Sequence, residues 1–235
     1  NSLQNLIIIE YDLPWLANIG GVKVITANDY ITNEFYSDFK GRIYNLCDSY
    51  KYQTIGYYVS LLAVARDNRV IPNVSTLKDF KNKSILRSIS DDVDEQIQSE
   101  LKMLSFSKFS IKIYFGFAKD KKYQKIANEL FQLFETPFLE IEFQKYDKWL
   151  VNKAIPFSKT SIQNEDYEFV NECAKKYFAL KKHSIKTLKY YQYDLAILVN
   201  DEEVTPPSDK KALSLFKKAA KEIDFYIEYI AKKDY

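Results

Sequence analysis

The sequence predicts an α/β fold of mixed α+β type, in which an open mixed sheet with helices on both faces is followed by a partial βαβ unit. Three observations support this prediction. The first third alternates short runs rich in Ile and Val with helical patterns, at spacings that suit a parallel sheet. The middle third contains runs of alternating apolar and polar residues, which are typical of half-buried strands. The last part starts a new strand–helix–strand pattern.

The first third of the chain is expected to form strands at 6–10, 22–27, 42–46 and 70–72, and helices at 28–39, 52–66 and 76–81. Asn28 or Asp29 is expected to cap the first helix and Ser75 the third, because short polar side chains accept hydrogen bonds from first-turn amides. Asp67 and Asn68 are expected to end the second helix, because Asn tolerates the left-handed backbone conformation.

The middle third is expected to form helices at 91–103, 121–134 and 165–180, and strands at 109–117, 138–145 and 148–157. Ser90 is expected to cap the first of these helices, whose acidic first turn suits the positive end of the helix dipole. In the strand at 138–145, Leu139, Ile141 and Phe143 alternate with polar residues and define a buried face. The last two strands are expected to pair as a hairpin.

A second unit is expected beyond a lysine-rich linker at 181–189. It should contain a strand at 193–199, an acidic loop at 201–207, a helix that is capped by Ser208 or Asp209 and ends near Lys221, and a strand at 225–230. Two strands and one helix leave a sheet edge and a helix face uncovered. We therefore expect two domains, at 1–185 and 190–235, the second of which is truncated and continues in a longer protein.

The composition argues against several functional classes. With 34 basic and 32 acidic residues the net charge is only +2, whereas a nucleic-acid-binding protein usually carries a clustered basic face. No stretch approaches the roughly 20 apolar residues that cross a bilayer, and the N-terminus lacks the pattern of a signal peptide. The two cysteines, Cys47 and Cys173, do not suggest a disulfide framework. We therefore expect a cytoplasmic protein that binds neither nucleic acid nor membrane.

Few residues offer catalytic chemistry. The single histidine, His183, lies in the lysine-rich segment and is expected to be a solvated surface residue. The chain has five glycines, and the sequence contains no glycine-rich phosphate-binding motif. The acidic cluster at 91–95 lies where a helix dipole favours negative charge, so capping is a better interpretation than metal binding. We therefore expect no catalytic residue and no metal ligand in this chain.

The most informative segment is the loop that follows the strand at 42–46. Open α/β sheets bind ligands at the carboxyl ends of strands, and unpaired first-turn amides near 50–53 would favour an anion. In an alternative interpretation, the polar groups of this loop only cap the helix, and a glycine in its first turn packs against a strand. A nucleophilic Cys47 is a further alternative, although no histidine lies near it in the sequence. The candidate substrate-binding residues are Asn45, Cys47, Asp48, Ser49, Tyr50, Lys51, Tyr52, Gln53, Gly56 and Arg66.

The same segment and several others carry recognisable motifs. They are Asn45-Leu-Cys, Ser49-Tyr, Tyr52-Gln, Gly56-Tyr-Tyr-Val-Ser-Leu-Leu-Ala, Ala65-Arg, Val70-Ile-Pro, Thr26-Ala-Asn-Asp-Tyr30, Ile113-Tyr-Phe-Gly116, Tyr193-Asp-Leu-Ala-Ile197 and Pro206-Pro-Ser-Asp-Lys-Lys-Ala-Leu213. Together they cover most of the chain, which resembles the N-terminal domain found ahead of RimK-like ATP-grasp ligases. The sequence differs from that pattern at Asp48, where a basic residue is common, and at Asp67-Asn68, where Gly is expected. The first difference argues against anion binding by the loop.

The resemblance implies a function for a longer protein. Such ligases join a carboxylate to an amine: ATP phosphorylates the carboxylate, and the amine then displaces the phosphate. ATP and Mg²⁺ are expected in a following ATP-grasp domain, so this chain alone is expected to bind no cofactor and not to be a ligase. Its expected role is substrate binding or domain and dimer organisation, with its own ATP-grasp domain, a small carboxylate or amine substrate and a second copy as partners. The alternative is a stand-alone small-molecule-binding or enzymatic α/β domain that uses the loop at 45–53.

Overall fold

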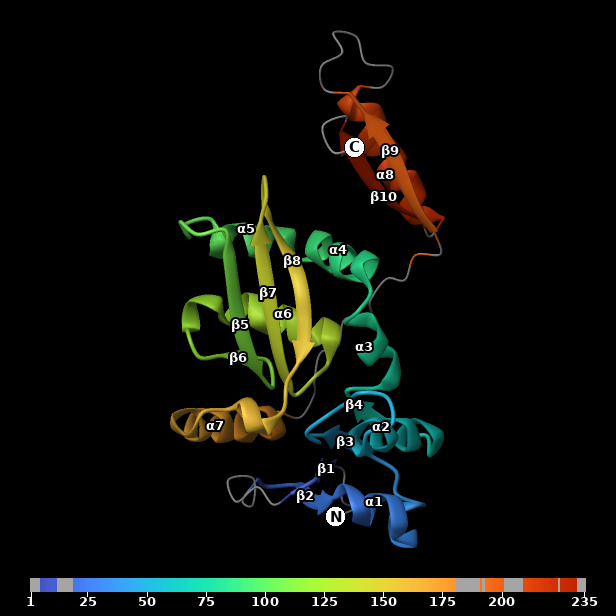
Figure 1. Cartoon of the computed structure of the whole chain (residues 1–235), viewed down its shortest axis with the longest axis vertical. Coiled ribbons are helices and arrows are strands. Elements are labelled where there is room, and N and C mark those ends of the chain that lie inside the picture. Colours follow the sequence, from blue (N-terminus) through green and yellow to red (C-terminus); the bar gives the residue numbers. More distant parts are fainter. Residues whose placement is uncertain are drawn as a thin grey trace. The chain divides into compact units, whose positions relative to one another are not determined.

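A computed structural model describes residues 5–11, 19–180, 191, 193–200, 209–223 and 225–231 (Figure 1). The chain divides into two compact units, Asn1–Thr187 and Leu188–Tyr235, each with its own strands. The mixed α/β class predicted from the sequence is confirmed. The predicted linker at 181–189, which includes His183, and the predicted loop at 201–207 lie outside the described residues. Within the described residues, no helix is both long and apolar enough to cross a membrane.

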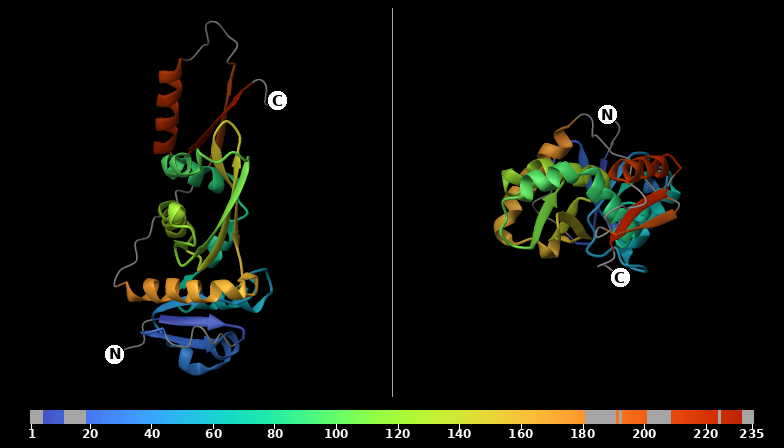
Figure 2. Two further views of the ribbon diagram at one scale, coloured as in Figure 1. Left: turned by 90° about the vertical axis from the view of Figure 1, so that its left-hand side faces the viewer. Right: turned by 90° about the horizontal axis from the view of Figure 1, so that it is seen from above.

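The first unit starts with a four-stranded parallel sheet in the order β2-β1-β3-β4. Its strands are β1 (Asn5–Ile9), β2 (Val22–Thr26), β3 (Arg42–Asn45) and β4 (Arg69–Ile71), and its helices are α1 (Ala27–Thr32), α2 (Ile55–Ala65) and α3 (Val74–Asp79). Leu6 and Ile8 of β1 share a core with Val59 of α2. On the other face, the Tyr44 ring of β3 lies 5.7 Å from the Tyr177 ring of α7 (Tyr167–Ala179). Figure 2 shows α7 and α1 on opposite sides of this sheet, so helices cover both faces, as predicted.

The second sheet of this unit is antiparallel, in the order β6-β5-β7-β8. It comprises β5 (Lys108–Tyr114), β6 (Phe117–Ala118), β7 (Phe138–Lys145) and β8 (Trp149–Pro156), and one face carries α4 (Lys83–Asp92), α5 (Asp94–Leu101) and α6 (Gln124–Phe134) (Figure 1). Leu139, Ile141 and Phe143 are buried, and the expected hairpin of β7 and β8 is confirmed. The single mixed sheet predicted from the sequence is corrected to two sheets, because the parallel strands β1–β4 pair only with one another and the antiparallel strands β5–β8 pair only with one another.

The second unit consists of β9 (Tyr193–Val199), α8 (Lys210–Glu222) and β10 (Phe225–Ala231). Its two strands are parallel, and α8 packs against β10. Asp209 caps the helix, because its carboxylate accepts a hydrogen bond from the Ala212 amide at 2.6 Å. The structure therefore confirms the strand–helix–strand unit and its cap.

Two helix caps of the parallel sheet differ from prediction. Thr26, rather than Asn28 or Asp29, caps α1, because its hydroxyl oxygen accepts a hydrogen bond from a first-turn amide at 3.0 Å. Asn73, rather than Ser75, caps α3 by accepting a hydrogen bond from a first-turn amide at 2.8 Å. Both helices begin almost directly after a strand, so the cap comes earlier than the sequence suggests. Short 3₁₀ turns form at η2 (Glu34–Tyr36), η3 (Lys121–Tyr123), η4 (Lys159–Ser161) and η5 (Asn164–Asp166).

The single helix expected at 91–103 is replaced by two helices, α4 and α5, which meet at Val93. Ser90 lies inside α4 and is not a cap. Its hydroxyl donates to the Leu86 carbonyl at 3.0 Å and accepts from the Val151 amide of β8 at 2.8 Å. Packing against β8 therefore stabilises a helix whose Ser and Asp residues disfavour it locally.

Candidate functional site

The parallel sheet defines one candidate site at the point where its strand order reverses. β1 lies between β2 and β3, so the chain leaves β1 toward one edge of the sheet and later returns on the other side of β1. In open α/β sheets, ligands bind outside the carboxyl ends of the strands at such a switch point. Glu10 and Tyr11 follow β1 there, and the loop at 46–53 follows β3.

Asn45, the last residue of β3, connects the sheet to α2. Its amide nitrogen donates to the Gly56 carbonyl at 2.7 Å and to the Ser60 hydroxyl at 2.9 Å. Its amide oxygen accepts from the Cys47 backbone N–H at 3.1 Å, and Ser60 in turn donates to the Pro72 carbonyl at 2.8 Å. Asn45 is fully buried and both of its polar atoms have partners, so its side chain joins β3, α2 and the segment after β4.

Gly56, in the first turn of α2, allows the loop to lie against the helix. A Cβ at this position would lie 2.3 Å from the Ser49 carbonyl oxygen and 2.7 Å from Cβ of Cys47. Glycine is therefore required for the close approach of the chain's own loop. The contacts of Gly56 and Asn45 are structural, and a contact of either residue with substrate remains a prediction.

Cys47 and Tyr50 lie in the interior of the loop. The Tyr50 hydroxyl donates to the Asn45 carbonyl at 2.7 Å. Burial raises the pKa of both the Cys47 thiol and the Tyr50 phenol, and the charges of Glu10 and Asp48 raise both pKa values further. A thiol that stays protonated is a poor nucleophile, so the structure does not favour the interpretation of Cys47 as a catalytic group.

Three charged side chains, Glu10, Asp48 and Lys159, form what we call the switch-point site; all three act electrostatically on the nearby Cys47 thiol. The Glu10 carboxylate accepts a hydrogen bond from the Asp48 amide at 3.0 Å, which joins the loops after β1 and β3. Lys159 donates to the Tyr11 carbonyl at 3.0 Å. The Oδ1 atom of Asp48 is buried and accepts no hydrogen bond from the described residues. Two carboxylates and one ammonium group give this site a net negative charge.

The second half of the loop, Lys51, Tyr52 and Gln53, is exposed to solvent. Ser49 precedes it and accepts a hydrogen bond from the Lys51 amide at 3.3 Å. The expected helix start at residue 52 is corrected, because Gln53 has a φ of 69°, which a right-handed helix cannot include, and α2 begins at Ile55. We expected the amides without intrahelical partners near residues 50–53. They lie instead in the first turn of α2, which begins at Ile55.

Arg66 lies at the opposite end of α2 from the loop. The helix has 11 residues, which corresponds to about 16 Å. The Arg66 guanidinium donates to the Tyr30 carbonyl at 2.8 Å and lies 4.9 Å from the centre of the Tyr30 ring. The structure therefore separates Arg66 from the other candidate residues and uses it to hold α1 against α2.

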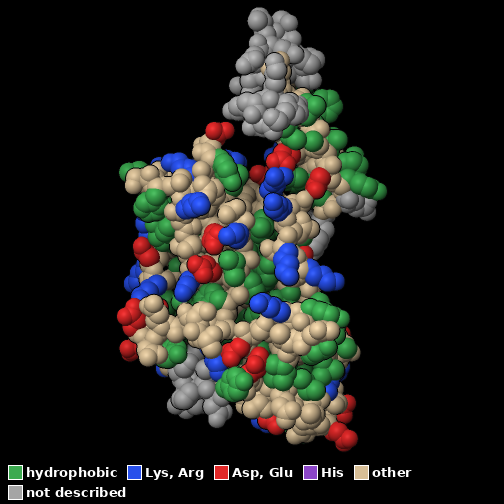
Figure 3. Space-filling model, viewed as in Figure 1, with side chains coloured by type: hydrophobic (Ala, Val, Ile, Leu, Met, Phe, Trp, Pro, Cys, Tyr) green, Lys and Arg blue, Asp and Glu red, His purple; other side chains and the backbone are tan. Residues whose placement is uncertain are grey.

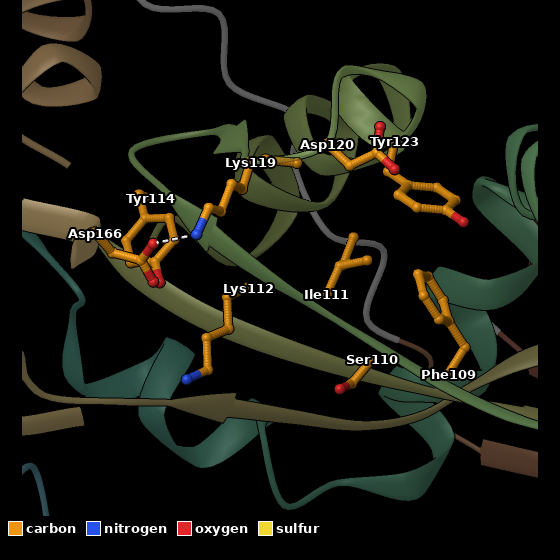
Figure 4. Close-up of a pocket in the computed structure, with 10 residues that line it drawn as sticks. Phe109, Ser110, Ile111, Lys112, Tyr114, Lys119, Asp120, Tyr123 and Asp166 are labelled. Atoms are coloured by element: carbon orange, nitrogen blue, oxygen red, sulfur yellow. Dashed lines mark hydrogen bonds and ion pairs between the residues drawn. The ribbon is translucent and has the colours of Figure 1, made fainter. Parts of the chain in front are cut away.

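A hollow beside β5, with a volume of about 330 Å³, was not predicted from the sequence. Its walls include Phe109, Lys112 and Tyr114 of β5, together with Lys119 and Asp166 (Figure 4). Lys119 and Asp166 form an ion pair of 2.5 Å, and burial together with the Asp166 charge raises the pKa of Tyr114 to about 12. These residues come together from distant segments, which no local pattern reveals. The two lysines of the hollow, Lys112 and Lys119, are matched by two carboxylates, Asp120 and Asp166, so the hollow presents little net charge to a ligand.

The described residues provide no obvious metal site. Among them, no three side chains of His, Cys, Asp or Glu come together in a way that could hold a metal ion. The two carboxylates of the switch-point site, Glu10 and Asp48, are accompanied by an ammonium group rather than by a third acidic ligand. The arrangement is suited to hydrogen bonding with a cationic group.

The buried thiols lead to a prediction about alkaline stability. Burial raises the pKa of Cys173 from 9.0 to about 12, and the pKa of Cys47 is raised as well. Above pH 9 the unfolded chain therefore loses thiol protons that the folded chain keeps. The free energy of unfolding should fall as pH rises, by up to about 1.4 kcal/mol per pH unit for each thiol. Urea unfolding at a series of pH values measures this slope, and Cys173→Ala should reduce it; a stability that stays constant above pH 9 would contradict the prediction.

Comparison with known proteins places the first unit in a recognised group. A family model described as the RimK-like ATPgrasp N-terminal domain matches residues 27–173. The match covers more than half of the chain and includes the loop after β3, Lys159 and the hollow beside β5. No curated protein matches the sequence.

Proposed function

This chain belongs to the family of RimK-like ATP-grasp N-terminal domains, and from that membership we propose a non-catalytic, substrate-binding role for it in a carboxylate–amine ligase. In this proposal the switch-point site holds the ammonium group of the amine substrate. The chain's partner is its own C-terminal ATP-grasp domain, which carries out the reaction. ATP and Mg²⁺ belong to that domain, where they activate the carboxylate substrate.

The buried Oδ1 atom of Asp48, which accepts no hydrogen bond from the described residues, supports this role most strongly. Leaving such an acceptor unpaired costs about 1–3 kcal/mol, and proteins mostly retain such groups where they serve a function. An ammonium group brings three N–H donors and would satisfy this oxygen. Glu10 adds a second carboxylate nearby. The net negative charge of the site therefore favours the amine over the carboxylate substrate.

The alternative of a stand-alone enzyme receives less support. It would use Cys47 as its nucleophile, but that thiol is buried and its pKa is raised. The chain's two free thiols, Cys47 and Cys173, are both buried and suit a reducing compartment, which supports a cytoplasmic location.

Asp48→Asn tests the proposed site, because it keeps the shape of the side chain and removes its charge. Titration calorimetry would use a panel of amino acids, amino acid amides and diamines, with amine-free carboxylic acids and Mg-ATP for comparison. We expect one class of amine to bind, Mg-ATP not to bind, and the variant to bind that amine at least about tenfold more weakly.

The exposed residue Asp38 provides the matched control, since Asp38→Asn removes the same charge away from the site. This control should bind the amine as the original chain does. Both variants should unfold within about 4 °C of the original chain, because neither loses an important contact. Equal amine affinity in the Asp48 and Asp38 variants, or binding of amine-free acids alone, would exclude the proposed site.

A further inference from the structure

The outward face of α2 is apolar over its whole length. None of the 11 residues in Ile55–Ala65 carries a charge. Four of them recur every three residues and are 36%, 45%, 43% and 51% exposed; we call these residues the α2 face: Ile55, Tyr58, Leu61 and Val64. Figure 3 shows hydrophobic side chains gathered over α2, at the lower right of the view. A surface helix normally turns charged residues to solvent, so a continuous apolar face of this kind marks an interaction surface.

We propose that the α2 face is the interface of a homodimer, in which the α2 helices of two copies pack antiparallel about a two-fold axis. Dimerisation through this face is independent of the proposed substrate-binding role. A two-fold interface brings the same patch of both copies together, so the patch must tolerate its own copy. The α2 face meets this requirement, because it carries no charge that would be repelled. Tyr58 and Leu61, near its middle, would lose their exposure to water on association.

Two charges that flank α2 favour a second copy in the antiparallel orientation. Lys51 lies in the turn before the helix and Asp67 directly after its end. Both are exposed, and neither forms an ion pair with another described residue. In an antiparallel pair, Lys51 of one copy lies at the same end as Asp67 of the partner copy. The cations at that end, Arg66 and Lys40, are held by the carbonyls of Tyr30 and Arg66, so Asp67 is the side chain there that is left to pair with Lys51. The helix dipoles also align favourably, whereas a parallel pair would bring like charges together.

The aromatic side chains at the start of α2 extend the face toward this charged turn. The Tyr52 ring, which is 73% exposed, lies 5.4 Å from the Tyr57 ring, and the Tyr57 ring lies 5.9 Å from that of Tyr58. Aromatic residues of this kind are enriched in protein interfaces. The proposed interface therefore runs without a break from Lys51 to the end of the helix.

Sedimentation equilibrium of the 235-residue chain tests the interface. We expect a monomer–dimer equilibrium that Leu61→Glu weakens at least about tenfold, because it brings two carboxylates together at the two-fold axis. Met103→Glu is the matched control: Met103 is 79% exposed and lies outside the α2 face, so this variant should dimerise as the original chain does. A chain that remains monomeric at about 100 μM, or a dimer that Leu61→Glu leaves unchanged, would overturn the proposal.

Charge exchange tests the orientation of the two helices. Lys51→Asp alone brings two acids together at each end and Asp67→Lys alone brings two lysines together, so each should weaken the dimer. The double variant restores opposite charges and should recover most of the lost affinity. Because Asp67 has a φ of 60°, which Lys adopts less readily, thermal unfolding must first show that each variant folds. A folded double variant that dimerises no better than the single variants would exclude the antiparallel arrangement.

Discussion

Replacement of Asn45 by Asp is expected to lower the free energy of unfolding by about 3–5 kcal/mol. The substitution exchanges an amide nitrogen for a carboxylate oxygen at a fully buried position. That oxygen would face the Gly56 carbonyl, which now accepts a hydrogen bond from the amide at 2.7 Å. One acceptor would then meet another, and a charge would be buried without a partner. Urea unfolding followed by circular dichroism measures the change.

Asn33→Asp is the matched control, because it makes the same chemical change at an exposed position. The Asn33 oxygen accepts a hydrogen bond from the Phe35 amide at 3.0 Å, and an Asp carboxylate can accept the same bond. We expect this control to change the free energy of unfolding by no more than about 0.5 kcal/mol. If both variants were equally stable, Asn45 would not hold β3 to α2 as described.

Gly56→Ala is expected to destabilise the chain by about 2–3 kcal/mol, although Ala is the better helix former by about 1 kcal/mol. The added methyl group would lie 2.3 Å from the Ser49 carbonyl oxygen, and because this atom belongs to the backbone the whole loop would have to move. Gly20→Ala is the control, since no atom lies within 4 Å of a Cβ at Gly20. Urea unfolding compares the two variants, and a Gly56→Ala variant as stable as Gly20→Ala would contradict the close approach of the loop.

The parts of the fold that depend on local patterns were predictable from the sequence. β7 occupies the predicted range at 138–145, because its alternation of apolar and polar residues is strong. The helix α4 was not predicted, because Ser90 was expected to cap a helix and lies inside α4 instead. Its hydroxyl accepts a hydrogen bond from the Val151 amide of β8, and that contact comes from a segment that is distant in the sequence. The separation of the strands into two sheets was missed for a similar reason, since strand pairing is decided by contacts between distant segments.

The candidate site was only partly visible in the sequence. The loop after β3 drew attention because it places many polar groups at the end of a strand. The structure shows Cys47 and Tyr50 hydrogen-bonded to Asn45 there, and substrate binding by these residues stays a prediction. Glu10 and Lys159 were not predicted, because they reach the loop from segments that are distant in the sequence. Arg66 was grouped with the loop by its nearness in the sequence, although a whole helix separates them.

Binding of an amino compound at the switch-point site can be mapped by a nuclear magnetic resonance titration of the isotope-labelled chain with the tightest amine of the panel described above. We expect shifts centred on the backbone amides of Tyr11, Asp48 and Lys159, and their loss in Asp48→Asn. Shifts confined to the hollow beside β5, around Lys112 and Lys119, or shifts that Asp48→Asn leaves unchanged, would exclude binding at the switch-point site.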